Sequence, residues 1–303
     1  SAGRSVWKRL LTEPLRRCRD RKGSKDMDRF YIVTNDGKDP DYAVTEKVNH
    51  LLLEAGKTTY LCEKDEKKKI IREMIPSDID CVIVIGGDGS LIEAARVFHA
   101  KEIPILGINM GTLGYLTEVE IGDIDEALSK LVRGDYTLES RMMIEGTFAD
   151  GGQDVALNDI VVSRKGVLRV LHFKLYVNGE LLNSYEADGI IISTPTGSTA
   201  YNLSAGGPIV EPTASMIVIT PICSHALNTS SIVLSAEDEL VVEIGRGRNG
   251  TVEEVFTTFD GADMVSMETG ECVTIRTSKA DTKIVKLSKI SFLEILRRKM
   301  KGN

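Results

Sequence analysis

The segment at residues 188–211 holds the densest group of side chains suited to binding a polar ligand. Six short hydroxyl residues follow an apolar run there: Ser193, Thr194, Thr196, Ser198, Thr199 and Ser204. Three glycines among them, Gly197, Gly206 and Gly207, let a backbone or a ligand come close. This composition favours a surface that recognises a polar ligand. The alternative interpretation is a Ser/Thr-rich loop at the end of a strand.

A glycine-rich turn between a strand and a helix is indicated at residues 81–98. Residues 81–85 are an unbroken apolar run, typical of a parallel strand buried on both faces. Ser90 and Glu93 match a capping box, which predicts a helix start at this point. The turn before it contains Gly86, Gly87 and Gly89. Free backbone N–H groups and the positive end of the helix dipole make such a turn a candidate phosphate site.

Two acidic positions carry side chains that can act on a ligand. Asp88 lies in the glycine turn, where it is either a first-turn carboxylate that favours the helix or a base or metal-binding acid beside a phosphate. Asn158 and Asp159 form a polar pair between two apolar runs. The pair is either a turn or a ligand contact at the end of a strand.

Together these segments resemble the NAD kinase family. The Thr196-Gly-Ser-Thr-Ala-Tyr-Asn202 segment is the most specific match, because Gly-Gly-Asp-Gly also occurs in diacylglycerol kinases and phosphofructokinases. The matches follow the family order from about Phe30 to the C-terminus: Gly86 to Gly89, Asn109 to Leu116, Asn158-Asp159, Asp188-Gly189, Thr194 to Asn202, Ser204 to Pro208, Pro221 to Cys223 with His225, Asp260-Gly261, and Phe292 with Leu296-Arg297.

Four positions depart from the family pattern. Ser90 replaces the usual Thr and keeps its hydroxyl, and Ser224 stands where Pro is common. Residues 229–231 replace a stretch that contains Arg-Pro, and Ala262 stands where Gln is common.

The resemblance implies a kinase that phosphorylates the 2′-hydroxyl of the adenosine ribose of NAD, with ATP or polyphosphate as donor and Mg²⁺ on the nucleotide. It implies that Asp88 accepts the hydroxyl proton. The implied residues for ATP and its phosphates are Gly86, Gly87, Gly89 and Ser90. The implied NAD-binding residues are Gly89, Tyr115, Asn158, Asp159, Asp188, Thr196, Thr199, Ala200 and Tyr201. His225 and Asp260 are implied to line the site, and no metal ligand is assigned to the protein itself.

The resemblance further implies a homodimer or homotetramer, with Asp188 closing the site on a neighbouring subunit's ligand. Two of the implied residues have other interpretations. Tyr115 also fits a linker between a strand and the next domain, and a lone histidine such as His225 is more often structural than functional.

Two other function classes remain open from the sequence. A lipid or sugar kinase would share Gly-Gly-Asp-Gly, but Leu91 to Ala94 replace the Asn-Glu that follows it in lipid kinases. A non-catalytic dinucleotide sensor is the other class, and the intact Asp88 argues against it. The Gly245 to Gly250 segment matches G-x-G-x-x-G but precedes a period-two pattern, so we interpret it as a hairpin turn.

Composition predicts a globular protein that binds neither nucleic acid nor a membrane. The 303 residues are 42% hydrophobic and 27% charged with a net charge of −7, and no apolar run approaches the length of a membrane span. Residues 1–25 hold nine Lys/Arg and two Asp/Glu, so the rest of the chain is strongly acidic. The five scattered cysteines indicate a reducing, cytoplasmic compartment.

The basic leader at residues 1–26 has no secretory pattern. We expect it to be an appended, largely unstructured segment. A mitochondrial targeting remnant, and with it a matrix location, is the alternative.

The elements that must position these residues divide into two kinds. Strands at 30–34, 58–62, 81–85 and 105–108 alternate with helices at 42–54, 65–74 and 90–98, which predicts a Rossmann-like parallel α/β domain, and a helix at 123–132 follows. Short alternating stretches from 140 to 285 predict an antiparallel β-sandwich, and the spacing at 292–300 predicts a helix. The resemblance implies that this helix returns to pack on the first domain. We therefore place the first domain at 27–122 plus about 286–303, and the NAD-binding sandwich at 123–285.

Overall fold

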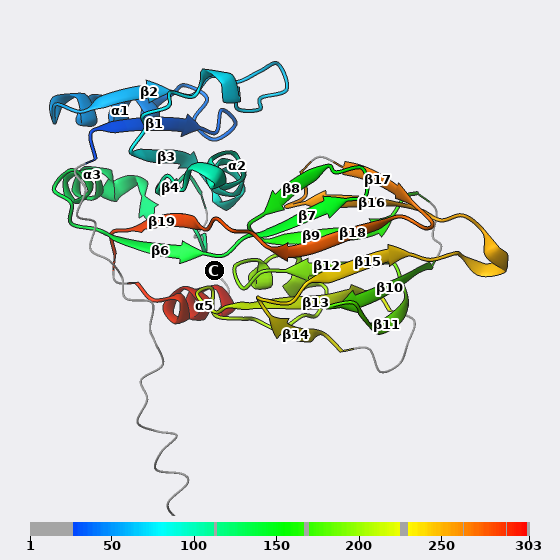
Figure 1. Cartoon of the computed structure of the whole chain (residues 1–303). Coiled ribbons are helices and arrows are strands. Elements are labelled where there is room, and N and C mark those ends of the chain that lie inside the picture. The colour runs from blue at the N-terminus through cyan, green and yellow to red at the C-terminus, as the bar shows by residue number, and fades with distance from the viewer. Residues whose placement is uncertain are drawn as a thin grey trace, which may run out of the picture.

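The computed structural model describes residues 27–111, 114–166, 170–224, 230–262, 264–288 and 290–301. They form one sheet flanked by helices and two antiparallel sheets (Figure 1). This arrangement confirms the predicted combination of an α/β layer and an antiparallel sandwich. The leader predicted at residues 1–26 and the predicted site residue His225 lie outside the described residues.

The first sheet has the strand order β2-β1-β3-β4-β19-β6, with β5 paired to β4. Strands β1 to β4 pair in parallel, as the alternation of strands and helices predicts. The strands are β1 (Arg29–Thr34), β2 (Thr58–Leu61), β3 (Cys81–Gly86), β4 (Ile105–Asn109), β5 (Val119–Glu120), β6 (Thr137–Arg141) and β19 (Thr282–Lys286).

Helices cover both faces of this sheet, and this explains the unbroken apolar run in β3. Ile83 packs in a cluster with α1 (Ala43–Glu54) and α3 (Ile124–Val132). Val84, on the opposite face, packs in a cluster with α2 (Asp88–Phe98). Single-turn 3₁₀ helices occur at η1 (Arg72–Met74), η2 (His99–Lys101), η3 (Ile121–Asp123), η4 (Gly197–Thr199) and η5 (Arg248–Gly250).

The prediction of a helix at residues 65–74 was wrong. The segment forms an isolated bridge between Lys64 and Ile70, followed only by the short η1. Asp65 explains the difference, because its carboxylate accepts hydrogen bonds from the N–H groups of Lys67 and Lys69, both at 2.9 Å. An Asp side chain that binds its own backbone in this way favours a turn over a helix.

Two six-stranded antiparallel sheets form the second half of the molecule. One has the order β11-β10-β15-β18-β7-β8 and the other β14-β13-β12-β9-β16-β17. The first comprises β7 (Ile144–Phe148), β8 (Gln153–Ala156), β10 (Leu171–Val177), β11 (Glu180–Ala187), β15 (Leu240–Ile244) and β18 (Cys272–Thr277). The second comprises β9 (Asp159–Arg164), β12 (Gly189–Ser193), β13 (Met216–Ile222), β14 (Ile232–Ser235), β16 (Glu254–Phe259) and β17 (Met264–Glu268).

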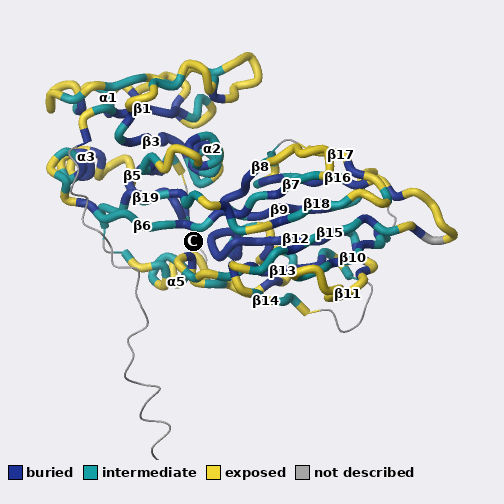
Figure 2. Tube along the Cα trace, in the orientation of Figure 1, coloured by how far each residue is buried: buried dark blue, intermediate teal, exposed yellow. Residues whose placement is uncertain are grey.

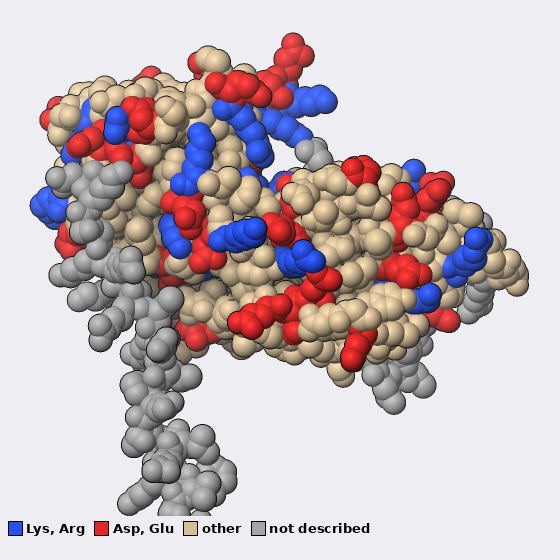
Figure 3. All heavy atoms as spheres, viewed as in Figure 1, with Lys and Arg blue, Asp and Glu red and all other residues tan. Residues whose placement is uncertain are grey.

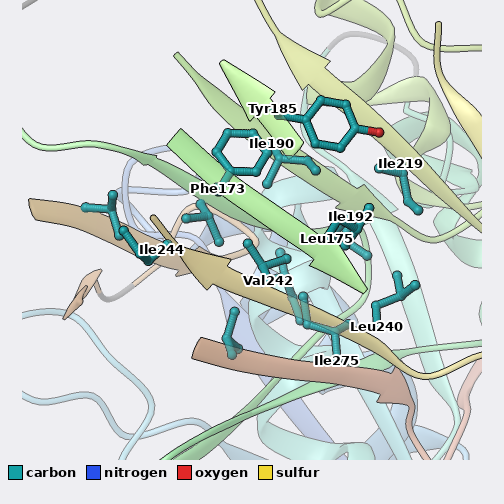
Figure 4. Packing of buried hydrophobic residues seen from close by; sticks show 14 of the residues in the cluster. Phe173, Leu175, Tyr185, Ile190, Ile192, Ile219, Leu240, Val242, Ile244 and Ile275 are labelled. Atoms are coloured by element: carbon teal, nitrogen blue, oxygen red, sulfur yellow. The ribbon is translucent and has the colours of Figure 1, made fainter. Parts of the chain in front are cut away.

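The inward faces of these two sheets share one apolar core. Phe173 and Leu175 of β10 alternate with polar residues and pack in the same cluster as Ile190 and Ile192 of β12 (Figure 4). The turn between β10 and β11 is Asn178-Gly179 with φ of 50° and 83°, the positive values that a two-residue hairpin turn requires.

The Gly245 to Gly250 segment is not a hairpin turn. It follows β15 in one sheet and precedes β16 in the other, so it connects the sheets instead of joining paired strands. Period-two alternation is the same for a strand in either sheet and therefore did not reveal the change of sheet. No helix begins after it, as the sequence predicts.

Several elements from the range 123–285 belong to the layer formed by the first sheet and its helices. α3 packs against α1, and β6 and β19 extend the sheet beyond β4. The division of the chain into domains stays a prediction, and these placements favour a boundary after Arg141. The last helix, α5 (Phe292–Met300), contacts Tyr115 in the loop after β4, which confirms that the C-terminal helix returns to the first domain.

Burial follows this architecture. Figure 2 shows buried strands at the centre of both halves and exposed connections at their edges. Among the described residues, no helix has the length and apolar composition needed to cross a bilayer.

Candidate functional site

The glycine turn after β3 leads directly into α2. The helix begins at Asp88 with Gly87 as its N-cap, three residues earlier than the predicted capping box requires. Ser90 is not the cap, because it lies inside the first turn of the helix, where its hydroxyl accepts a hydrogen bond from Asn35 Nδ2 at 2.8 Å. A Cβ at Gly89 would meet no atom within 4 Å, so this face of the turn is open. The N–H groups at the start of α2 are therefore accessible to a ligand.

Lys38 lies beside this turn and was not identified from the sequence. A Cβ built at Gly87 would lie 2.7 Å from Lys38 Nζ, and one at Gly111 would lie 3.4 Å from it. Among the described residues, no ion pair engages this ammonium. A positive side chain and the positive end of a helix thus share one place at the carboxyl ends of β3 and β4. An anion bound there would relieve the repulsion between them.

Asp88 ties the turn to the loop that follows β4. Its Oδ2 accepts a hydrogen bond from Tyr115 N at 2.6 Å. Its Oδ1 accepts bonds from Leu116 N at 3.1 Å and from Thr117 N at 3.0 Å, and also from the Thr117 hydroxyl. A Cβ at Gly114 would lie 2.1 Å from Oδ1. Gly114 therefore permits the loop to reach the carboxylate.

A second loop is organised by Asp260, which follows β16. Its carboxylate accepts hydrogen bonds from the backbone N–H groups of Leu157, Asn158 and Asp159 at 2.8, 2.7 and 3.1 Å. These contacts span more than a hundred residues of sequence and hold the Asn158-Asp159 pair in position at the start of β9. Asp260 has φ of 53°, a left-handed conformation that asparagine and aspartate tolerate better than most residues.

Asp159 is buried with an exposed fraction of only 5%. Burial, and then the nearby negative charge of Asp260, raise the pKa of the Asp159 carboxyl to about 7. Burial also raises the pKa of Asp260, although its three backbone donors oppose this change. The pair therefore brings a carboxyl group that titrates near neutral pH to the site.

Most hydroxyls of the Ser/Thr-rich segment are used to hold its own fold. Thr194 Oγ1 donates to Leu157 O at 2.5 Å, and Ser198 Oγ donates to Pro195 O at 2.7 Å. A Cβ at Gly197 would lie 2.0 Å from Asn158 O, so the segment packs directly on the Asn158-Asp159 loop. The two segments that the sequence singled out are thus in contact.

Four predicted residues of this segment lie nearer to solvent or to charge. Thr196 is buried and receives a hydrogen bond from Arg141 Nη1 at 3.3 Å. Thr199 and Ala200 are half-buried, and the Tyr201 side chain is 46% exposed. This part of the segment therefore offers a hydroxyl, a methyl and an aromatic ring to a ligand.

Asp188 lies apart from these residues. It precedes β12, whereas Thr196 to Tyr201 follow it, so the five-residue strand separates them by roughly 17 Å. Its carboxylate forms an ion pair with Arg164 at 3.0 Å. The structure does not bring Asp188 to the site of its own chain.

A cavity of about 400 Å³ lies between the first domain and the sandwich. Its walls are the exposed side of α2, the turn after β16 and the segment before η1. The lining residues are Lys69, Ile70, Arg72, Gly89, Ile92, Glu93, Arg96, Val97, Asp260, Gly261 and Ala262. Gly89 and Asp260 were identified from the sequence. Ile92, Glu93 and Arg96 were missed, although their spacing on one helix face was a readable signal.

The cavity is rich in cationic side chains. Arg96 is anchored by Val155 O at 3.0 Å and by Asp154 of the sandwich. Lys69 and Arg72 line the opposite side, at the end of a basic run in an acidic protein. Figure 3 shows Lys and Arg side chains gathered where the first domain overhangs the sandwich. In the described part of the chain, no three His, Cys, Asp or Glu side chains are arranged to hold a metal ion.

Comparison with known families matches both halves of the chain. Residues 30–136 match the ATP-NAD kinase N-terminal domain, and residues 157–287 match the ATP-NAD kinase C-terminal domain. The two matches include the glycine turn, the Asn158-Asp159 pair, the Ser/Thr-rich segment and Asp260.

Similar proteins and structures agree with this match. The NAD kinase of Lachnospira eligens is 44% identical over 294 residues, covering 90% of this chain and all of that protein. The NAD kinase of Agathobacter rectalis is 44% identical over 282 residues, covering 91% and 99%. Yeast NADH kinase complexed with NADH shares the fold, with a TM-score of 0.79, 21% identity and coverage of 92% and 89%. The Archaeoglobus fulgidus NAD kinase in complex with ATP gives 0.74, 24%, 91% and 99%.

Proposed function

Since this chain belongs to the ATP-NAD kinase family, we propose which of its residues carry out phosphoryl transfer from ATP to NAD. The activity is that of an NAD kinase, a phosphotransferase with an alcohol acceptor. The two other function classes considered from the sequence, a lipid or sugar kinase and a non-catalytic sensor, are set aside by this membership. The observation that carries the assignment of residues is the Asp88 carboxylate at the start of α2, which four hydrogen bonds from residues 115–117 hold in place.

The donor phosphates bind at the glycine turn in this proposal. Gly89 leaves its face of the turn open, Gly87 lets the Lys38 ammonium come close, and Gly86 makes room for Ser90, which fixes the neighbouring loop through Asn35. Lys38 adds a positive charge at the same place. Mg²⁺ arrives bound to the ATP phosphates and neutralises part of their charge. This help matters in a chain whose net charge is −7.

Asp88 is the proposed acceptor of the proton from the 2′-hydroxyl of the adenosine ribose. Its Oδ2 has one hydrogen bond, from Tyr115 N, and so keeps a lone pair for the hydroxyl proton. The three bonds to Oδ1 hold the carboxylate in one orientation. In the transfer, the 2′-oxygen forms a bond to the γ-phosphorus, the bond from that phosphorus to the bridging oxygen breaks, and the proton passes to Asp88.

NAD lies against the sandwich wall in this proposal. Asn158 and Asp159 bind ribose hydroxyls and adenine from the loop that Asp260 holds. Thr196, Thr199, Ala200 and Tyr201 contact the adenine, and Gly89 and Tyr115 complete the cleft on the other wall. His225 is proposed to line the same site.

We propose a homodimer or homotetramer in which Asp188 serves a neighbouring subunit. The supporting observation is that Asp188 lies at the far end of β12 from Thr196. Its carboxylate then reaches the NAD of another subunit. The proposed location is the cytoplasm, with neither nucleic acid nor a membrane as a partner.

A coupled assay tests the proposed function. The full chain is supplied with NAD, ATP and Mg²⁺, and the NADP formed is detected with an NADP-specific dehydrogenase. Parallel reactions replace ATP by polyphosphate, and NAD by NADH, to define the donor and the redox form accepted. A chelator control removes the divalent cation and should abolish turnover. Absence of NADP formation with every donor would overturn the proposal.

A further inference from the structure

The loop that binds Asp88 is also held from its other side by the end of the chain. Glu118 Oε1 accepts a hydrogen bond from Leu287 N at 3.1 Å and another from Ser288 N. Glu118 Oε2 lies 2.8 Å from Lys286 Nζ in an ion pair whose side chains are 5% and 15% exposed. The residues directly after β19 are therefore bound to the loop at residues 114–118.

α5 then contacts the same loop at Tyr115. The ring centroids of Tyr115 and Phe292 are 6.1 Å apart with an interplanar angle of 42°. Lys299 Nζ lies 4.3 Å from the centroid of the Tyr115 ring, a cation–π geometry. Phe292 and Lys299 come from the first and last turns of α5, so the whole helix lies along this side chain.

These contacts join the helix to Asp88 through one residue, Tyr115. Phe292 and Lys299 hold the Tyr115 ring, and Tyr115 N donates the 2.6 Å hydrogen bond to Asp88 Oδ2. Oδ2 is the oxygen that the proposed mechanism leaves for the ribose hydroxyl. A shift of the Tyr115 backbone therefore changes the orientation of that oxygen directly.

α5 itself is weakly held. None of its residues is buried, and Leu293 and Met300 are 71% and 74% exposed. Its own stability comes from the Ser291 N-cap, which accepts a hydrogen bond from Glu294 N at 3.2 Å, and from the Glu294–Arg298 ion pair. A helix with so little buried surface opens at low cost in free energy.

We propose that α5 is a positioning element of the active site, in which Phe292 and Lys299 set the place of Tyr115 and thereby of the Asp88 carboxylate. The inference rests on the proposed role of Asp88. In this role Phe292 and Lys299 act through the Tyr115 side chain. Their effect is on how often the loop at residues 114–118 holds the geometry needed for transfer.

The first test compares four variants of the full chain by steady-state kinetics. Phe292→Ala should lower kcat about three- to tenfold and raise the KM for NAD, because an aromatic pair is lost. Lys299→Gln should lower kcat about two- to fivefold, and Lys299→Arg should restore it, because guanidinium also stacks on a tyrosine ring. Leu293→Ala is the matched control on the solvent side of the same helix and should leave kcat and both KM values unchanged.

The second test does not depend on activity. Hydrogen exchange is measured on the peptide that contains residues 114–118, whose N–H groups at Tyr115, Leu116 and Thr117 are bound by Asp88. Phe292→Ala should accelerate exchange there at least severalfold and leave the β10–β11 hairpin unchanged. Leu293→Ala should accelerate neither.

The outcomes separate this inference from the function on which it rests. Unchanged exchange at residues 114–118 and unchanged kcat in Phe292→Ala would overturn the positioning role. An equal loss in Leu293→Ala would also overturn it, since the effect would then be general to the helix. If the wild-type chain forms no NADP but Phe292→Ala still accelerates exchange, the coupling of α5 to the loop stands and the proposed function fails.

Discussion

The two walls of the site are built in different ways. The first wall is one continuous segment, in which β3, the glycine turn and α2 follow one another, with Lys38 beside them. The second wall joins three distant segments, the Asn158-Asp159 loop, the Ser/Thr-rich segment and the Asp260 turn. On the first wall a Cβ at Gly89 meets no atom, whereas on the second a Cβ at Gly197 lies 2.0 Å from Asn158 O.

This difference separates residues that face a ligand from residues that hold the site together. The open turn leaves its N–H groups and Lys38 accessible, so changes there should affect turnover and donor binding. The polar groups of the second wall are bound mostly to one another, so changes there should affect stability first. Asp88 and Asp159 are the exceptions, because each combines a position in the site with burial or internal hydrogen bonds.

The largest effect is expected from Asp88→Asn, where the comparison predicts loss of turnover. The kcat should fall about 10²–10⁴-fold, because the proton acceptor is removed. The free energy of unfolding should also fall, by about 1–3 kcal/mol, because an amide cannot accept all four hydrogen bonds. Thr117→Val removes only the hydroxyl bond to Oδ1 and controls for loosening of the loop. A near-normal kcat in Asp88→Asn would show that Asp88 is not the base.

A matched pair of glycine substitutions tests the comparison most directly. Gly197→Ala should lower the free energy of unfolding by about 3 kcal/mol or more, because the methyl group overlaps a backbone carbonyl. Gly89→Ala should change it by about 0.5 kcal/mol or less, since the methyl enters open space. Urea unfolding measures both. Equal losses in the two variants would break the distinction between the walls.

The Asp159 carboxyl should make stability depend on pH in a specific direction. Its pKa of about 7 lies above the ordinary value near 4, so between these pH values the native chain holds a proton that the unfolded chain has lost. Its contribution to stability therefore falls as pH rises from 4 through 7. Asp159→Asn lacks this loss and should be more stable than wild type by about 4 kcal/mol at pH 8, with little difference at pH 4.

Unfolding of both proteins in urea at a series of pH values measures that difference. A gap between the two proteins that stays constant from pH 4 to pH 8 would contradict the assignment of the titrating group. The KM for NAD should rise in Asp159→Asn, because the ribose would then be bound by Asn158 and an amide instead of by Asn158 and a carboxyl group.

The smallest effect concerns Lys38. Lys38→Gln should raise the KM for ATP about 10- to 100-fold with little change in the KM for NAD, because one charged contact to phosphate is lost. Lys101→Gln removes the same charge at the other end of α2 and is the matched control. If the KM for NAD rises instead, Lys38 binds the NAD pyrophosphate and not the donor.

The elements of the first wall could be predicted from the sequence because they are contiguous in the chain. Strand, turn and helix occupy residues 81–98 without interruption, and only the start of α2 was misplaced. The fold class followed from the same local alternation. The helix predicted at residues 65–74 does not form, because the two backbone contacts of Asp65 outweigh the helical pattern of its neighbours.

The residues of the second wall were predicted mainly from the family resemblance and less from local sequence patterns. The contact between Asp260 and residues 157–159 spans more than a hundred residues, and nothing in either segment alone encodes it. Lys38 and Arg72 were missed because exposed loop cations have no periodic pattern, and only their three-dimensional position distinguishes them from other surface charges. The change of sheet between β15 and β16 could not be predicted either, because period-two alternation is the same for a strand in either sheet.

The place of β19 in the first sheet has a consequence for synthesis on the ribosome. β19 lies between β4 and β6, although it is the last strand of the chain to be made. β4 must therefore wait on the order of ten seconds or more, at ordinary rates of translation, for its neighbour to emerge. During that time the β4 edge next to β19 is open to pairing with another nascent chain. We expect the first sheet to be completed late in synthesis, and the yield of enzyme to depend on how well chaperones shield that edge.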